Sequence, residues 1–82
     1  MIKIRLQRKG KKHYSIYSIV LADSKKPRDG KIIKKLGIYN PNLNNDKKII
    51  IYNKEEIIKY LKNGAQPTKT VKSILKQYKI KK

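Results

Sequence analysis

Basic side chains dominate the residues of this sequence that could do chemistry. The chain has 23 Lys and Arg against 5 Asp and Glu, which gives a formal net charge of +18. Self-repulsion of that size opposes a compact state, so we expect a polyanionic partner, with nucleic acid favoured over an anionic membrane surface. Arginine binds phosphate in a bidentate fashion, and its three positions are therefore the first candidates for direct contacts. They are Arg5, Arg8 and Arg28.

Most of the remaining predicted contacts fall in three clusters of positive charge along the sequence. The first cluster lies near the N-terminus, the second in the middle of the chain, and the third along a C-terminal helix. Beyond the arginines, the predicted RNA-binding residues are Lys3, Lys9, Lys11, Lys12, His13, Lys25, Lys26, Lys31, Lys35, Tyr39, Asn40, Lys69 and Lys72. Tyr39 is expected in a loop, where it either stacks on nucleic acid or anchors the loop itself. This spread favours contact with folded RNA over one groove-reading helix.

Few residues suit catalysis. His13, the only histidine, lies in a basic loop without a nearby carboxylate in sequence, so a phosphate contact or a surface role is favoured over general-base chemistry. The absence of cysteine excludes disulfides, thiolate zinc sites and a cysteine nucleophile. We predict no catalytic residue, no metal and no cofactor. A small nuclease that uses Asp23, Asp29 or Asp46 with a divalent metal is the least favoured alternative.

The elements that must position these side chains begin with strands. Period-two patterns predict strands over residues 1–7, 14–21, 31–38 and 48–52. A basic connection over 8–13 should turn at Gly10, and Gly37 should mark a bulge or a close backbone approach. An Asn-rich loop is expected over 40–46. The loop over 23–30 should be shaped by Asp23, Ser24, Asp29 and Gly30.

Two helices should follow the strands. Asn53 with Glu56 resembles a capping box, and Gly64 is placed to end that helix. Thr68 should cap a second, amphipathic helix whose apolar stripe suits core packing better than a membrane. Most tyrosines are also assigned to the core. We predict an α+β domain, a small four- to five-stranded mostly antiparallel or mixed sheet with two short helices packed on it. One domain should span residues 1–82, with a frayed basic tail at about 79–82.

Several segments together resemble the signature of the bacterial-type small-subunit ribosomal protein sixteen family. They are residues 19–24 (IVLADS), 27–30 (PRDG) and 37–41 (GIYNP). Residues 4–10 are similar to the family's first strand and turn, and residues 64–68 to the entry of its C-terminal helix. The resemblance covers nearly the whole chain in order. It departs at residues 15–17, where the family usually has Pro-Phe-Tyr, and at Lys25 and Lys34, where Arg and Glu are expected.

The resemblance implies a structural, RNA-binding protein of the small ribosomal subunit. Such a protein binds small-subunit ribosomal RNA, chiefly its 5′ domain, and stabilises that fold during assembly. The implied partners are this RNA and neighbouring small-subunit proteins, with no membrane and no homo-oligomer. The implied location is the ribosome of the cytoplasm or of an organelle. Charge alone also leaves open a nucleoid-associated protein that binds nucleic acid without a defined RNA site.

Overall fold

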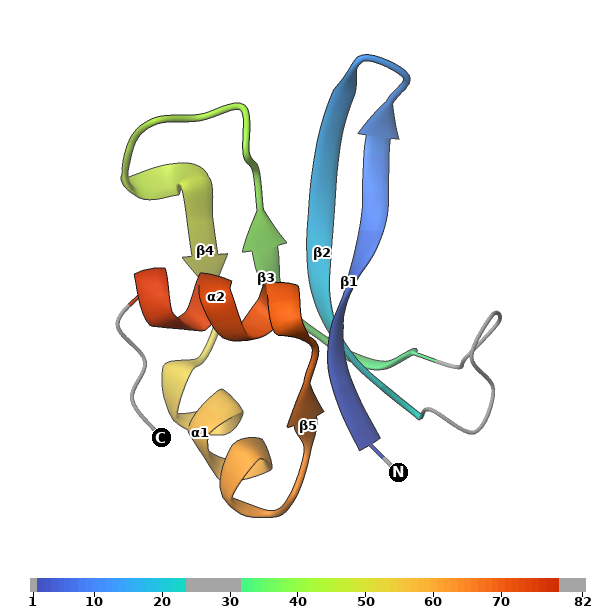
Figure 1. Ribbon diagram of the computed structural model, residues 1–82, viewed down its shortest axis with the longest axis vertical. Coiled ribbons are helices and arrows are strands. Elements are labelled where there is room, and N and C mark those ends of the chain that lie inside the picture. Colours follow the sequence, from blue (N-terminus) through green and yellow to red (C-terminus); the bar gives the residue numbers. More distant parts are fainter. Residues whose placement is uncertain (1, 24–31, 79–82) are drawn as a thin grey trace.

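Five strands form one mixed sheet against which two helices pack (Figure 1). The computed structural model describes residues 2–23 and 32–78. The sheet order is β4-β3-β2-β1-β5. The strands are β1 (Ile2–Lys11), β2 (Tyr14–Asp23), β3 (Ile32–Tyr39), β4 (Ile49–Ile51) and β5 (Gln66–Pro67), and the helices are α1 (Lys54–Lys62) and α2 (Lys69–Gln77). The predicted α+β class is confirmed.

The first two strands form a hairpin longer than the sequence pattern indicated. Their antiparallel register runs without a break from Ile2 opposite Asp23 to Lys11 opposite Tyr14, which leaves only residues 12–13 as the turn. The prediction that Gly10 makes the turn is therefore wrong. Gly10 lies inside β1 with a φ of 95°, and a Cβ there would overlap the carbonyl oxygen of Tyr14. Glycine is needed for close backbone approach within the hairpin.

The hydrophobic core lies between one face of this sheet and the two helices. Alternation along β1 and β2 sends Ile4, Ile19 and Leu21 to that face, where all three are buried. Helix α2, which crosses in front of the sheet in Figure 1, buries its apolar stripe against them. The remaining buried members of this core are Leu36, Ile49, Ile57, Ala65, Val71, Ile74 and Leu75. The predicted apolar faces of the first strand and of both helices are confirmed.

Strands β3, β4 and β5 complete the sheet, and a short 3-10 turn precedes β4. Gly37 lies beside a register shift between β2 and β3, and a Cβ on it would overlap the carbonyl oxygen of Ile50. The predicted close approach is confirmed. A single 3-10 turn, η1 (Asp46–Lys48), leads into β4 and was not predicted. Nor was β5, which pairs in parallel with β1 and is held by the Thr68 N–H donating to Ile4 O at 3.0 Å.

Both helices begin at the predicted caps. The Asn53 side chain accepts from the Glu56 N–H at 3.2 Å, and the Thr68 hydroxyl accepts from the Val71 N–H at 3.3 Å. The capping box is only half made, because the Glu56 carboxylate turns to Lys34 on β3 instead of Asn53. Gly64, with a φ of 96°, follows α1 as expected and donates to Leu61 O.

The tyrosines do not follow the prediction that most belong to the core. Tyr14, Tyr52 and Tyr78 are exposed, whereas Tyr39 and Tyr60 pack partly against the core. A phenol ring combines an apolar body with a polar tip, so it suits half-covered positions such as these. Within residues 2–23 and 32–78, no helix is long and apolar enough to cross a membrane.

Candidate nucleic-acid interface

An arginine near the tip of the β1–β2 hairpin is held by hydrogen bonds to the turn and to the opposite strand. The Arg8 guanidinium donates from Nε and Nη2 to the Ser15 hydroxyl at 3.3 and 3.0 Å, and from Nη2 to Lys12 O at 3.5 Å. These contacts use the Nε and Nη2 side of the guanidinium group, which has five N–H donors in all. The Nη1 group makes no hydrogen bond to the part of the chain that the structure describes. Arg8 is therefore held in place while two N–H groups stay available to an oxyanion.

Four further basic side chains surround Arg8. Lys9, Lys11, Lys12 and His13 are all exposed at this end of the hairpin. The two-residue turn forces them close together, because strands of an antiparallel pair lie about 5 Å apart. These residues form one surface, which we call the hairpin tip (Arg8, Lys9, Lys11, Lys12 and His13), whereas Lys3 and Arg5 of the predicted N-terminal cluster lie farther down the hairpin.

The loop between β3 and β4 is tied to the hairpin tip by asparagine side chains. The Asn42 amide donates to Ser15 O at 2.9 Å, and the Asn40 amide donates to the Tyr14 hydroxyl at 3.3 Å. Asn42 also donates to Asn40 Oδ1 from its backbone N–H at 3.0 Å and from its side chain at 2.9 Å. The two loops, which lie side by side at the top of Figure 1, therefore form one polar edge.

Asn42 is a residue that the sequence reasoning missed. The available signal was the Asn-Pro-Asn run at 40–42, since an asparagine side chain readily accepts from the backbone N–H two residues on. Nothing in that run, however, indicates which distant loop the Asn42 amide will reach. Tyr39, predicted to lie in the loop, instead ends β3 and is half-buried with its ring centroid 6.1 Å from that of Tyr17. This is the loop-anchoring arrangement, and base stacking by Tyr39 stays a prediction.

A second set of cations lies on the sheet face that α1 and α2 do not cover, here called the second face. Alternation opposite Ile4 places Lys3 and Arg5 there, and the register sets Lys35 directly across β2 from Arg5, with Val20 between them. Val20 is only 1% exposed and lies outside the main cluster of core residues. Lys3 and Lys35 beside it are exposed, whereas Arg5 is half-buried.

The lysines of α2 face the opposite side of the molecule. Because Val71, Ile74 and Leu75 turn inward, Lys69 and Lys72 are exposed on the side of α2 away from the sheet. They do not join the cations of the second face. The predicted basic residues within 2–23 and 32–78 thus occupy three surfaces that point in different directions: the hairpin tip, the second face and the outer side of α2.

One lysine of the middle cluster is used internally. Lys34 Nζ lies 2.6 Å from Glu56 Oε2, joining β3 to the first turn of α1. This hydrogen bond to Glu56 raises the pKa of Lys34 above its usual value, and desolvation opposes that rise. Lys34 therefore joins two elements of the fold, and its charge is already paired with Glu56 within the protein.

Several predicted residues cannot be placed. Lys25, Lys26, Arg28 and Lys31, with the loop-shaping Ser24, Asp29 and Gly30, lie outside the described residues, as does the tail at 79–82. Asp23 ends β2 and is half-buried opposite Ile2. Over residues 2–23 and 32–78, no cluster of His, Asp and Glu side chains could hold a metal ion.

Comparison with known protein sequences gives a family match. The model of the family "Ribosomal protein S16" matches residues 8–68, from the hairpin tip to the cap of α2. The chain belongs to the ribosomal protein S16 family. This confirms the resemblance drawn from the sequence. The S16 family is one of structural proteins and not of enzymes, so the nuclease alternative is set aside.

Individual relatives agree with the S16 assignment. The chain is 52% identical over 77 residues to the small ribosomal subunit protein bS16 of Metamycoplasma arthritidis, covering 94% of this chain and 86% of that protein. The bS16 protein of Halothermothrix orenii is 47% identical over 76 residues, 93% of this chain and 84% of that one. That of Amoebophilus asiaticus is 51% identical over 74 residues, 90% of this chain but only 60% of the longer relative.

Proposed function

We propose that this protein is a structural component of the small ribosomal subunit that binds ribosomal RNA, chiefly its 5′ domain, and stabilises the RNA fold during assembly. Membership of the S16 family and the names of the relatives support the ribosomal role. Neighbouring small-subunit proteins are the other expected partners, with no membrane and no homo-oligomer. The expected location is the ribosome, in the cytoplasm or in an organelle.

The observation that carries RNA binding is the direction of the cations. A protein that reads one groove needs its charges on one element, whereas these charges point three ways from a molecule whose shortest extent is 19 Å. Several RNA segments that converge at a junction could each meet one cationic surface. The protein would then bind the folded arrangement, because only folded RNA presents all of those phosphates together.

Within this proposal the arginines make the closest phosphate contacts. Arg8 offers its free Nη1 group at the hairpin tip, and half-buried Arg5 offers a guanidinium on the second face. Lys3, Lys9 and Lys35 add positive potential around them. Arg28 has the same proposed role in the loop outside the described residues.

The test is a salt-matched competition assay with labelled small-subunit ribosomal RNA 5′ domain. Excess transfer RNA and excess duplex DNA serve as competitors at equal phosphate concentration. We expect both to compete weakly, because neither presents the converging phosphates of the folded domain. Competition by both that is as strong as competition by unlabelled 5′ domain would instead favour the nucleoid-associated alternative, in which charge alone determines binding.

A further inference from the structure

The free edge of β4 carries unpaired backbone groups in a regular pattern. Asn40 N–H donates to Lys48 O at 2.7 Å, and Tyr52 N–H donates to Leu36 O at 3.1 Å. These residues are direct partners in the antiparallel register, so Ile50 must also turn its backbone groups toward β3. By the same alternation the N–H and C=O groups of Ile49 and Ile51 point away from the sheet, and the described part of the chain offers them no backbone partner.

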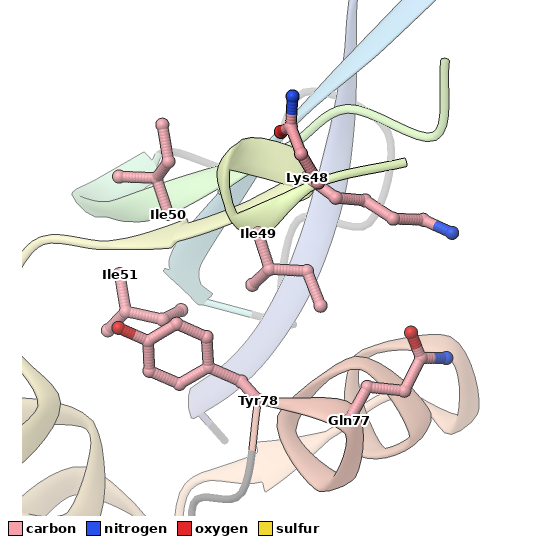
Figure 2. A pocket seen from close by; sticks show the side chains of 7 residues that line it. Lys48, Ile49, Ile50, Ile51, Gln77 and Tyr78 are labelled. Atoms are coloured by element: carbon pink, nitrogen blue, oxygen red, sulfur yellow. The ribbon is translucent and has the colours of Figure 1, made fainter. Parts of the chain in front are cut away.

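A groove of about 590 Å³ runs along this edge. Figure 2 shows the side chains of Ile49 and Ile51 pointing toward the end of α2, where the Tyr78 ring lies beside Ile51. Ile50 points to the other side of the strand. The groove therefore offers half-buried Ile51 and the exposed Tyr78 ring as apolar contacts beside the free backbone groups, whereas the Ile49 side chain belongs mainly to the core.

Among the described residues that line this groove, one is positively charged and none is negatively charged. Lys48 lies at one side of it in Figure 2, and the other polar lining residues are Asn45 and Gln77, which are neutral. A second copy of this chain, itself at +18, would be repelled from such an edge. Nucleic acid would gain from Lys48, and its phosphates could accept from the N–H groups, but a phosphate diester has no donor for the C=O groups that alternate with them. An acidic polypeptide satisfies both features.

We propose that the β4 edge binds an extended, acidic polypeptide segment by strand addition, with apolar side chains of that segment entering the groove beside Tyr78. The segment supplies the missing partners for Ile49 and Ile51, while its acidic side chains meet Lys48. Alternation of apolar and acidic residues is required, because successive side chains of a strand face opposite ways. This protein-binding surface is separate from the cations assigned to RNA.

The experiment is an NMR titration of the ¹⁵N-labelled full chain, without RNA, with the capped peptide Glu-Val-Glu-Val-Glu-Val. We expect saturable shifts of the Ile49 and Ile51 amide signals, larger than those at the hairpin tip. The matched peptide Glu-Val-Glu-Pro-Glu-Val keeps the charge but removes one central N–H, and it should shift these signals far less. Equal effects of both peptides, or shifts confined to lysine-rich surfaces, would show charge attraction alone and overturn the proposal.

Two protein variants define the groove further. Lys48→Glu should weaken peptide binding about two- to tenfold, whereas Lys62→Glu, the same charge change on α1, should leave it within about twofold. Tyr78→Ala should also weaken binding while the other amide signals keep their positions. In the last titration, a single-stranded RNA hexamer replaces the peptide. Larger shifts of Ile49 and Ile51 with RNA than with the peptide would contradict strand addition, and no shift with the peptide would do so as well.

Discussion

Two glycines share an unusual backbone conformation but not the same surroundings. Gly10 and Gly64 have φ values of 95° and 96°, a region that side chains with a Cβ rarely adopt. A Cβ at Gly64 would meet nothing within 4 Å, whereas one at Gly10 would overlap Tyr14 O. The two positions therefore separate the conformational requirement for glycine from the steric one.

Replacing each glycine by alanine tests this difference. Gly64→Ala should lower the free energy of unfolding by about 1 kcal/mol, the ordinary cost of a left-handed alanine. Gly10→Ala should cost about 2–3 kcal/mol, because the hairpin must also move apart. Urea unfolding of both variants measures the free energies. Equal losses would mean that the hairpin accommodates the extra methyl group freely.

The ion pair between Lys34 and Glu56 should give a pH-dependent contribution to stability. The pKa of Lys34 is raised in the folded protein by its hydrogen bond to Glu56, so the pair stabilises the fold at pH values below the unfolded lysine pKa of 10.5. That contribution is lost as the pH rises through the higher folded value. Thermal midpoints of wild type and Glu56→Gln should thus differ slightly at pH 9 and converge at still higher pH.

Glu55→Gln supplies the control for that comparison. It removes the neighbouring exposed carboxylate from the first turn of α1 and leaves the Lys34–Glu56 pair in place. Its midpoint should not converge with that of the wild type in the same pH range. A constant gap between wild type and Glu56→Gln at every pH would show that the carboxylate acts through something other than the lysine.

At the scale of elements, α1 depends on a single fully buried side chain. Ile57 is 0% exposed and is the one buried residue of this helix, whereas α2 buries three. We expect Ile57→Ala to lower the free energy of unfolding by about 2–5 kcal/mol through lost transfer energy and a residual cavity. Ile33→Ala, at a 54% exposed position on β3, should cost about 0.5 kcal/mol or less. Similar costs in urea unfolding would place α1 outside the cooperative core.

The hairpin is the element whose charges should matter most to the RNA proposed as its ligand. The double variant Lys11→Gln with Lys12→Gln should reduce the slope of log affinity against log salt by about 2, one unit for each lost phosphate contact. Lys54→Gln with Lys59→Gln removes the same charge from α1, which carries no predicted contact, and should leave the slope nearly unchanged. Identical slopes for the two variants would show that position in the fold does not matter.

At the scale of the whole molecule, excess positive charge works against the compact state. The chain carries +18 over extents of 32 × 29 × 19 Å, so many cations lie within a Debye length of one another at low salt. The thermal midpoint should therefore rise when salt increases from about 10 to 150 mM, over which the Debye length falls from about 30 to 8 Å. Ribosomal RNA 5′ domain should raise it further by binding only the folded protein. A midpoint indifferent to both additions would contradict this account.

The sequence alone determined the features that depend on neighbouring residues. Strand and helix patterns follow from local apolar periodicity, and the caps at Asn53 and Thr68 need only a side chain two or three residues from a free N–H. The family resemblance and the class of partner followed from short segments and from total charge. These are sums or local patterns, so no knowledge of the packing is needed to read them.

Only the tertiary structure decided which distant residues meet. The Asn42 contact to the hairpin, the pairing of Lys34 with Glu56 and the two-residue strand β5 each join segments far apart in the chain. Pairing register also moved the turn from Gly10 to residues 12–13, because a hairpin turns where its two strands end. The exposed edge of β4 arises in the same way. A strand becomes an edge through its place in the sheet, and no local pattern encodes that place.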